Sequence, residues 1–557
     1  MLQNNFIELL EESVKKYWDS PAFSNFGEKP LNYKEIAEKI LLFHDVFRKS
    51  KIKRGDKIAV VGPNSVNWAI TYLSTITYGA VIVPILCDFH AEDIQHIVNH
   101  SDARYLFVAK SIYDRIDEET MPGLEAVFSL EDFSLYYRKE KRLRKMVKEA
   151  EKKLKKEGVT KEDFSLPSGI ENSDLAAILY TSGTTGFSKG VMLPNNSLLA
   201  NVMFARNNIT LEVGSRVLSF LPLAHSYPCS FDFLFPFTVG CHITFLGQMP
   251  SPKILLGAFA EVKPCLILFV PLILEKLYKK QIAPLLNKGA VKTMLRLPAL
   301  SSLLKNKIRK KLEAAFGGNF RQIVIGGAAL NCDVEKFLKN IGLRFTVGYG
   351  MTECGPLISF AHWDEHRAES VGKTIGCLES KIASSDPVRE VGEILVRGEN
   401  VMLGYYKNEE ATREVLDEEG WLRTGDLGVF DQDGFIYIKG RSKNMILGPS
   451  GQNIYPEEIE SKLNVMPFIQ ESLVMDEKGS LIAIVYPDWE SVDALKVKDE
   501  EAEKWLEKKM EENRKAVNET LPNYCRLSRI QFHAEPFEKT PTQKIKRFLY
   551  QVKTPAA

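Results

Sequence analysis

The chain has 557 residues, of which 45% are hydrophobic and 26% charged, so it is long enough for several domains and far from the composition of a disordered protein. Its 73 Lys and Arg residues nearly balance its 72 Asp and Glu residues, so the net charge gives no reason to expect nucleic-acid binding. The eight cysteines lack the CxxC spacing of zinc or thioredoxin-type sites, which predicts reduced thiols in the cytosol.

The N-terminal segment, residues 1–20, predicts an amphipathic helix. Acidic residues lie within its apolar part, and no basic region precedes an uninterrupted apolar one, so it lacks the pattern of a secretory signal. The most apolar run, at 264–274, is far shorter than the ~20 residues that a helix needs to cross a bilayer. We therefore expect no membrane span and a cytoplasmic protein.

Short apolar segments alternate with helical ones through the first part of the chain, which is typical of crossover units in a largely parallel sheet. A second alternating stretch runs from about Leu175 to Met351, and from Val391 short strands separated by turn residues predict a β-rich segment. These patterns predict the α/β fold class. In the first stretch we expect strands at 57–62, 80–85 and 104–109, and helices at 65–79 and 90–101.

Residues 138–156 predict a basic amphipathic helix, because they include eleven Lys or Arg residues and three Glu residues. Leu143, Val147, Ala150 and Leu154 recur at helical spacing and form its apolar stripe. Two interpretations are open. The helix is either a solvated insertion with one face on the protein body, or a peripheral contact for anionic lipid head groups at the inner face of the membrane.

A segment rich in glycine and turn-forming residues after Gly440 predicts a domain boundary. We expect a large N-terminal domain at 1–440, built of mixed α/β layers with a β-rich subdomain, and a small α+β C-terminal domain at 441–557. Residues 500–522 predict a charged surface helix in the smaller domain.

The string YTSGTTGFSKG at 180–190 directly follows an apolar strand expected at 175–179 and is the strongest chemical signal in the chain. Its glycines allow the backbone to approach an anion closely, its hydroxyls donate hydrogen bonds, and its lysine adds positive charge. These features predict a phosphate-binding loop. The Walker pattern GxxxxGK[ST] does not fit the string, which argues against a kinase or a GTPase. The candidate residues are Thr181, Ser182, Gly183, Thr184, Thr185, Gly186 and Lys189.

With this loop, the chain resembles the adenylate-forming superfamily, which includes acyl-CoA synthetases, luciferases and the adenylation domains of peptide synthetases. Six further family motifs follow in the expected order. The resemblance implies ATP, Mg²⁺ and coenzyme A as cofactors or co-substrates, and Thr184 as a catalytic residue. The motifs are LPLAHSY (221–227), GGAAL (326–330), GYGMTECGP (348–356), LRTGD (422–426), GRSKN (440–444) and PTQKIKR (541–547).

The resemblance implies nucleotide-binding roles for residues in two of these motifs. Tyr349, followed by Gly350, would stack on adenine, and Thr352 would hydrogen-bond the α-phosphate. Glu353 would bind Mg²⁺, a hard ion that prefers oxygen ligands. Asp426 would accept hydrogen bonds from both ribose hydroxyls, a task that suits an acceptor-only carboxylate.

Three other parts of the expected site have two interpretations each. Gly326, Gly327 and Ala328 would let the backbone run flat beside the nucleotide and the acyl carbonyl, although such a string also suits a tight turn. His225 would lie beside the carboxylate of the acid substrate, although a lone histidine is more often structural. The aromatic segment 230–240 would either line an acyl channel or belong to the core.

In the C-terminal domain the resemblance points to three cationic residues. Lys544 would contact the substrate carboxylate and the α-phosphate during adenylation, and it would neutralise charge in the transition state because a lysine is protonated near pH 7. Arg441 would bind the nucleotide, and Lys443 would be the hinge about which a mobile C-terminal domain swings. The chain departs from the family at Gln543, where glycine is common.

Together these features predict an AMP-forming fatty acid–CoA ligase. It would activate a medium- to long-chain fatty acid with ATP to acyl-AMP and pyrophosphate, and then transfer the acyl group to coenzyme A. The stretches at 263–278 and 303–330 most resemble the long-chain branch of the family. An acyl-acyl-carrier-protein synthetase would share every adenylation residue, so an acyl carrier protein stays open as the acceptor. A non-catalytic nucleotide-binding scaffold would predict the loss of Glu353, Asp426 or Lys544, and all three are present.

Overall fold

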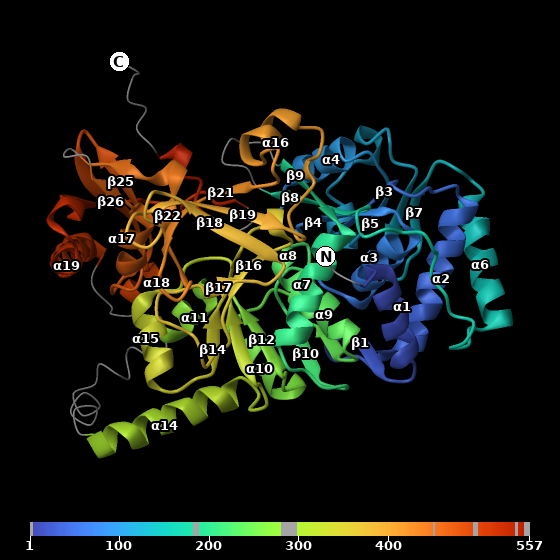
Figure 1. Cartoon of the computed structure of the whole chain (residues 1–557), viewed down its shortest axis with the longest axis horizontal. Coiled ribbons are helices and arrows are strands. Elements are labelled where there is room, and N and C mark those ends of the chain that lie inside the picture. Colours follow the sequence, from blue (N-terminus) through green and yellow to red (C-terminus); the bar gives the residue numbers. More distant parts are fainter. Residues whose placement is uncertain are drawn as a thin grey trace.

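The computed structural model describes residues 4–181, 189–279, 298–448, 452–493, 499–540 and 544–550. In these residues the chain forms layers of helices and sheets, which confirms the predicted α/β class (Figure 1). Within the described part of the chain, no helix combines the length and apolarity needed to cross a membrane.

The first large sheet has the strand order β20-β9-β8-β4-β3-β5-β6-β7 among the described residues. Its central strands run parallel, and successive side chains of β3 alternate between two cores, since Ile58 and Val60 pack on one face while Ala59 and Val61 pack on the other. The predicted central elements are confirmed. They are β3 (Lys57–Val61), α3 (Val66–Tyr78), β4 (Val81–Ile85), α4 (Ala91–His100) and β5 (Ala103–Val108).

Outside this centre the same sheet contains strands from three other parts of the chain. The strands are β6 (Ala126–Ser129), β7 (Leu135–Arg138), β8 (Leu175–Thr181), β9 (Lys189–Pro194) and β20 (Gly404–Tyr405). β8 and β9 form an antiparallel pair, and β20 pairs antiparallel with β9, so the segment around residue 404 lies directly beside the strand that follows the phosphate-binding loop. This pairing positions part of the site described below.

The second large sheet has the order β14-β13-β12-β10-β11-β1-β2 among the described residues. Its main strands are parallel, and a continuous hydrophobic core joins its buried residues to one face of the first sheet. Helices α7 and α9 lie in the middle of the molecule, near the strands of both sheets (Figure 1). The strands are β1 (Pro21–Asn25), β2 (Leu31–Asn32), β10 (Arg216–Ser219), β11 (His242–Phe245), β12 (Leu266–Phe269), β13 (Gln322–Ile325) and β14 (Phe345–Val347).

Helices cover both sheets. The longer helices of this part of the chain are α1 (Phe6–Lys16), α2 (Tyr33–Lys49), α7 (Asn195–Asn208), α10 (Pro252–Val262), α14 (Pro298–Ala315) and α15 (Cys332–Asn340), and shorter ones are α9 (Phe235–Thr238) and α11 (Pro271–Leu277). The predicted N-terminal amphipathic helix is confirmed as α1, whose buried face contributes Phe6, Leu10 and Val14 to the core.

The predicted β-rich segment is confirmed as an antiparallel sheet with the order β18-β19-β21-β22. It begins before the expected position, because its first strand already pairs with β19. A small sheet, β15-β16-β17, lies next to it in sequence and presents the GYGMTE motif. The strands are β15 (Tyr349–Gly350), β16 (Leu357–Phe360), β17 (Lys373–Thr374), β18 (Leu378–Ala383), β19 (Gly392–Gly398), β21 (Leu422–Phe430) and β22 (Ile436–Arg441).

The C-terminal part has a hydrophobic core of its own, which runs from Ile454 to Leu527. The predicted charged helix is confirmed as α19 (Asp499–Glu519). The domain division at 440/441 stays a prediction, and the separate core is an argument for it. The elements are β23 (Ile446–Leu447), β24 (Asn453–Ile454), α17 (Pro456–Leu463), β25 (Ile469–Glu477), β26 (Ser480–Pro487), α18 (Trp489–Asp493) and β27 (Arg529–Phe532).

The basic helix, α6, spans Leu143–Glu157, so the prediction that it begins at residue 138 was wrong. Residues 135–138 instead form β7, which pairs antiparallel with β6 at the edge of the first sheet. The pairing of Arg138 with Ala126 thus places the first residue of the predicted helix in the sheet. Leu143 and Ala150 of α6 are buried, and the helix packs beside α2, at the end of the molecule opposite the C-terminal part (Figure 1).

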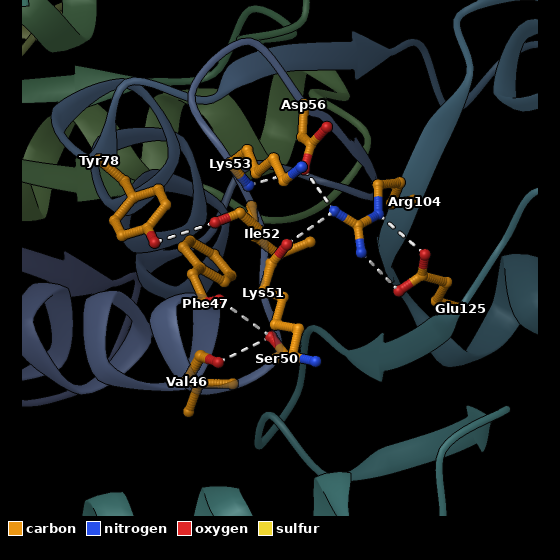
Figure 2. A network of polar contacts seen from close by, with 10 residues as sticks. All are labelled: Val46, Phe47, Ser50, Lys51, Ile52, Lys53, Asp56, Tyr78, Arg104 and Glu125. Atoms are coloured by element: carbon orange, nitrogen blue, oxygen red, sulfur yellow. Dashed lines mark hydrogen bonds and ion pairs between the residues drawn. The ribbon is translucent and has the colours of Figure 1, made fainter.

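A polar network connects β5 and the segment before β6 to the end of α2 (Figure 2). The guanidinium of Arg104 donates two hydrogen bonds to Glu125, at 2.8 and 2.9 Å, and it also pairs with Asp56. A further bond from Arg104 reaches the backbone carbonyl of Lys51, at 3.1 Å. A single arginine thus connects β5, the segment before β6 and the loop after α2, in the bidentate geometry that makes such pairs strong.

Candidate active site

The predicted phosphate-binding loop connects the two strands of a hairpin. Thr181 ends β8 and pairs across the hairpin with Lys189, the first residue of β9. The hydroxyl of Thr181 donates to the backbone carbonyl of Lys189 at 3.4 Å. Both residues are therefore placed at the mouth of the loop. The candidates Ser182, Gly183, Thr184, Thr185 and Gly186 lie outside the described residues.

The GYGMTE motif forms a tight turn that depends on glycine. A Cβ atom on Gly350 would lie 2.2 Å from the backbone oxygen of Pro356, which no side chain can tolerate. Thr352 and Glu353 follow in a short 3₁₀ turn, both half-buried. Tyr349 is buried, and its hydroxyl donates to Oδ2 of Asp426 at 2.7 Å. The adenine and ribose candidates are thus joined by a direct hydrogen bond.

Asp426 lies opposite Arg441 in the register of β21 and β22. The Nε atom of Arg441 is 2.8 Å from Oδ1 of Asp426, and the Asp426 side chain is only 7% exposed. Arg441 is more open to solvent, and burial and the negative charge of Asp426 act in opposite directions on its pKa, which is raised overall. Each carboxylate oxygen of Asp426 therefore has one partner and can accept a further hydrogen bond.

Glu353 is held in place from two directions. Its backbone oxygen accepts a hydrogen bond from the N–H of Met402 at 2.8 Å, and its Oε1 atom accepts one from the hydroxyl of Tyr405 at 2.8 Å. In the described ranges, no basic side chain forms an ion pair with this carboxylate. A half-buried carboxylate anchored in this way supplies the hard oxygen donors that suit Mg²⁺, so Glu353 fits the predicted metal.

The GGAAL motif follows β13 and adopts a backbone that needs glycine. Gly327 has φ +90°, a left-handed conformation that side chains disfavour. A Cβ atom on Gly326 would lie 3.2 Å from Cζ of Tyr227, and the Tyr227 hydroxyl donates to the carbonyl of Val324 at 3.1 Å. Tyr227 therefore packs against the glycine backbone, and Gly327 and Ala328 are exposed beyond it.

His225 and Lys544 are far apart in the sequence, and the positive charge of Lys544 acts on His225 in the folded protein. Burial, followed by the positive charge of Lys544, lowers the pKa of His225 to about 4, so the imidazole is neutral at pH 7. The pKa of Lys544 is lowered by burial and by Arg441, while the carboxylates of Asp426 and Glu353 raise it. Lys544 is nevertheless exposed to solvent.

Several contacts place the C-terminal part against the rest of the protein. The side-chain amide of Asn331 donates to the carbonyl of Ser461 at 2.5 Å, and Lys439 pairs with Glu458 at 3.7 Å. Lys443, the predicted hinge, lies exposed in the 3₁₀ turn Ser442–Asn444 between β22 and β23. The structure therefore shows an arrangement in which Lys544 faces the sites on the larger part.

The aromatic segment 230–240 belongs to the core. Phe233 and Phe237 are buried against Phe23, with ring centroids 5.8 and 5.3 Å apart, and Phe235 is fully buried. The interpretation of these side chains as an acyl channel was therefore wrong. The ring centroids of Phe231 and Tyr227 are 6.0 Å apart. Phe231 therefore contacts Tyr227, the residue that packs against the glycine motif.

Two residues with special environments were missed by sequence analysis. Tyr405 contacts Glu353, which is 52 positions away in the sequence, and no local sequence pattern predicts such a contact. Asp232 lies in a π-helical turn (Cys229–Leu234) and is fully buried; neither carboxylate oxygen has a hydrogen-bond partner in the described structure. An acidic residue within an otherwise apolar run was the available signal for Asp232.

The arrangement brings together groups suited to nucleotide chemistry. They are an acceptor carboxylate, a second carboxylate that fits a metal, a neutral histidine and two cationic side chains. Such a site can bind a nucleotide and neutralise charge that develops on a phosphoryl group. The residues that converge are His225, Tyr349, Glu353, Asp426, Arg441 and Lys544.

Comparison with known proteins agrees with this geometry. Residues 10–406 match the family model described as "AMP-binding enzyme", which covers more than half of the chain. The long-chain-fatty-acid--CoA ligase FadD15 of Mycobacterium bovis is 28% identical over 541 residues, covering 89% of this chain and 86% of the relative. A long-chain-fatty-acid--CoA ligase of Escherichia coli is 27% identical over 524 residues, covering 88% of this chain and 85% of the relative.

Among solved structures, the chain is similar to the anthranilate CoA ligase AuaEII in complex with anthranoyl-AMP, with a TM-score of 0.77. The two share 20% identity over 99% of this chain and 97% of that one. At this identity the likeness shows the fold.

Proposed function

The chain belongs to the AMP-binding enzyme family, and from this premise we propose that it is an AMP-forming ligase that joins a fatty acid to coenzyme A. The observation that carries the proposal is the position of Lys544, whose ammonium interacts electrostatically with Asp426 and Glu353 although it lies in the C-terminal part and they lie in the larger part. This arrangement suits a reaction in which one lysine contacts the substrate carboxylate and the α-phosphate at the same time.

In the first step the fatty-acid carboxylate attacks the α-phosphate of ATP, an acyl–AMP bond forms, and pyrophosphate leaves. Tyr349 and Asp426 hold the adenosine, with Arg441 fixing the orientation of the Asp426 carboxylate. Lys544 neutralises charge on the carboxylate and the phosphate, and Thr352 and the phosphate-binding loop hold the phosphate oxygens. Glu353 would hold Mg²⁺, which supplies further positive charge to the phosphates. The protein thus contributes positioning and charge.

In the second step the thiol of coenzyme A attacks the acyl-adenylate carbonyl, and AMP leaves. We propose that the C-terminal domain, residues 441–557, swings about Lys443 between the steps. The exposed position of Lys443 between β22 and β23, outside both hydrophobic cores, supports this role. The swing would remove Lys544 from the acyl phosphate and open a path for the thiol.

The substrate class rests on the relatives, because the aromatic segment that suggested a channel belongs to the core. Relatives with 27–28% identity over most of their length carry the name long-chain-fatty-acid--CoA ligase. We therefore propose a fatty acid of about twelve or more carbons. Each buried CH₂ contributes about 0.8 kcal/mol, so a channel that fits such chains would discriminate strongly against short acids.

The acceptor thiol separates the proposed function from its alternative. An acyl-acyl-carrier-protein synthetase would use the same adenylation residues. The experiment measures ATP–pyrophosphate exchange over acetate, benzoate and fatty acids of increasing length, followed by acyl transfer to coenzyme A or to a carrier protein. Exchange that peaks at acetate or benzoate would contradict the fatty-acid proposal, transfer to the carrier protein alone would favour the alternative, and no exchange with any acid would favour a scaffold.

We also propose that α6 contacts anionic membrane surfaces. Its apolar residues, including Leu143 and Ala150, pack against the protein, so the face left to solvent is basic. Contact would therefore be electrostatic rather than insertion of an apolar face, and it would bring the enzyme to a substrate that dissolves poorly in water.

A further inference from the structure

We propose that Tyr405 is a positioning residue that holds Glu353 in the orientation needed to bind a divalent cation and holds Lys189 beside the same site. The proposal rests on the proposed function, since it concerns the metal and nucleotide of that reaction. Tyr405 belongs to none of the motifs that indicated the site, but its side chain contacts residues of two of them, Glu353 and Lys189.

The side chain of Tyr405 makes two polar contacts. Its hydroxyl donates to Oε1 of Glu353 at 2.8 Å, and the ammonium of Lys189 lies 4.6 Å from the centroid of its ring. The ring is 7% exposed, so the geometry of both contacts is fixed by packing. Because one oxygen of Glu353 is held by Tyr405, the other is left to face a cation.

The backbone around Tyr405 reinforces the same connection. Met402 donates its N–H to the carbonyl of Glu353 at 2.8 Å, and β20 pairs with β9, where Tyr405 lies opposite Val191. The segment 402–406 therefore forms a bridge between the turn that presents Glu353 and the strand that begins with Lys189.

The neighbouring Tyr406 provides an internal contrast. Tyr406 directly follows β20, and its hydroxyl donates to Oδ2 of Asp102 at 2.7 Å rather than to Glu353. Two adjacent tyrosines thus have the same chemistry and similar hydrogen bonds to carboxylates, but one of these carboxylates belongs to the candidate metal site.

The Tyr405 hydroxyl is a reliable donor. A phenol has an unperturbed pKa of about 10, so the hydroxyl carries its proton near pH 7 and can donate it to the carboxylate. A hydrogen-bonded partner of a metal-ligating carboxylate orients the ligand, and losing one typically weakens metal binding by about tenfold to a hundredfold.

The test replaces Tyr405 with Phe, which retains the buried ring and removes the hydroxyl. Calorimetry measures Mg²⁺ binding, and the paramagnetic resonance of Mn²⁺ gives a second reading, both with a non-hydrolysable ATP analogue. We expect Tyr405→Phe to bind the cation about tenfold to a hundredfold more weakly, with an unchanged melting temperature and unchanged affinity for the analogue in EDTA. Tyr406→Phe is the matched control and should bind the cation like the wild type.

A second variant separates the two contacts. Tyr405→Leu also removes the aromatic ring below Lys189, so analogue affinity in EDTA should fall by about twofold to fivefold relative to Tyr405→Phe. A double-mutant cycle then tests whether Tyr405 acts through Glu353, since Tyr405→Phe should have no further effect on cation binding in a Glu353→Gln background.

Wild-type cation affinity in Tyr405→Phe, or an equal loss with and without the Glu353 carboxylate, would overturn the inference. A wild-type protein that binds neither the analogue nor the cation would instead overturn the proposed function itself, and with it the premise of this inference.

Discussion

The hydroxyl of Tyr349 donates a hydrogen bond to Oδ2 of Asp426 at 2.7 Å, although the two residues are 77 positions apart. The other oxygen of the same carboxylate lies 2.8 Å from Nε of Arg441. The groups expected to hold adenine and ribose are thus fixed relative to each other before any nucleotide binds. Such preorganisation reduces the entropic cost of binding.

Asp426→Asn should weaken ATP binding by about tenfold to a hundredfold, because hydrogen bonds to a charged group contribute about 1.5–3 kcal/mol. Nucleotide affinity measured by calorimetry checks this expectation. Analogues lacking a ribose hydroxyl provide the control: wild type should bind 2′-deoxy-ATP more weakly than ATP, and the variant should lose much of this discrimination. If both proteins discriminate equally, Asp426 does not contact the ribose.

Lys544→Ala should slow adenylation by on the order of 10²–10³, the usual cost of removing a preorganised charge from a transition state. Pyrophosphate exchange measures this half-reaction. Thioester formation from supplied acyl-AMP should be affected much less, because Lys544 leaves the site before that step in the proposed cycle. Lys546→Ala is the matched control, since Lys546 pairs with Glu538 at 3.5 Å and has no assigned role. Equal losses in the two half-reactions would argue against the domain swing.

Asp232→Leu should stabilise the protein by about 1–3 kcal/mol, because it replaces a buried polar group that has no partner by an apolar one of similar size. Asp232 is 0% exposed, and burial raises the pKa of its carboxyl well above the usual range, because burial disfavours the charged form. Unfolding by urea or heat tests the expectation.

Asn201→Leu is the control for this substitution. Asn201 is equally buried, but its side chain donates to the carbonyls of Ser197 and Cys354 and accepts from the N–H of Leu357. Its loss should destabilise the protein. Comparable destabilisation by Asp232→Leu would mean that Asp232 has a partner, such as a bound water.

Stability should decrease below about pH 6.5 in part because of His44. This side chain is 8% exposed, and its Nε2 atom lies 3.1 Å from the carbonyl of Ser74 and 3.0 Å from the hydroxyl of Thr77. Burial lowers the pKa of His44 to about 4 in the folded protein. In the unfolded chain this histidine is protonated near pH 6.5, whereas in the folded protein it is protonated only near pH 4.

The stabilisation from neutral His44 is therefore present above pH 6.5 and is lost as the pH falls towards 4. Its contribution should change by about 2 kcal/mol between pH 7 and pH 5. Unfolding of wild type and His44→Gln at both pH values measures the difference, and identical pH dependence of the two proteins would exclude the assignment.

Liposomes with anionic lipid should bind the protein in low salt and release it in high salt, because charge interactions are screened. Neutralising three exposed lysines of α6 should weaken binding by on the order of 100-fold, at about 1 kcal/mol per lysine. The same number of exposed lysines on α19 is the control. Sedimentation with vesicles measures the binding of both sets of variants. Equal effects of the two sets would mean that α6 is only a solvated insertion. The substitutions are Lys148→Gln, Lys152→Gln and Lys155→Gln on α6, and Lys504→Gln, Lys508→Gln and Lys515→Gln on α19.

Local patterns in the sequence were sufficient for the alternating elements. Strands β3, β4 and β5 and helices α3 and α4 lie where periodicity predicted them, because side-chain periodicity is set by the geometry of the element itself. The candidate site residues could also be identified from the sequence, since each motif is a contiguous string. The start of α6 was misjudged because Arg138 belongs to β7, which forms a hairpin with β6, and the charge pattern of the basic segment gives no sign of this pairing.

Tertiary structure decided what those strings do together. The bonds from Tyr349 and Arg441 to Asp426, the approach of Lys544 and the contact of Tyr405 with Glu353 all join residues that are distant in sequence. Packing also decided whether the aromatic segment 230–240 lines a channel or belongs to the core, because an apolar run has the same composition in both. Sequence determined the chemical groups available, and the packing of sheets and domains determined which of them meet, because distance in space is not encoded in any local window.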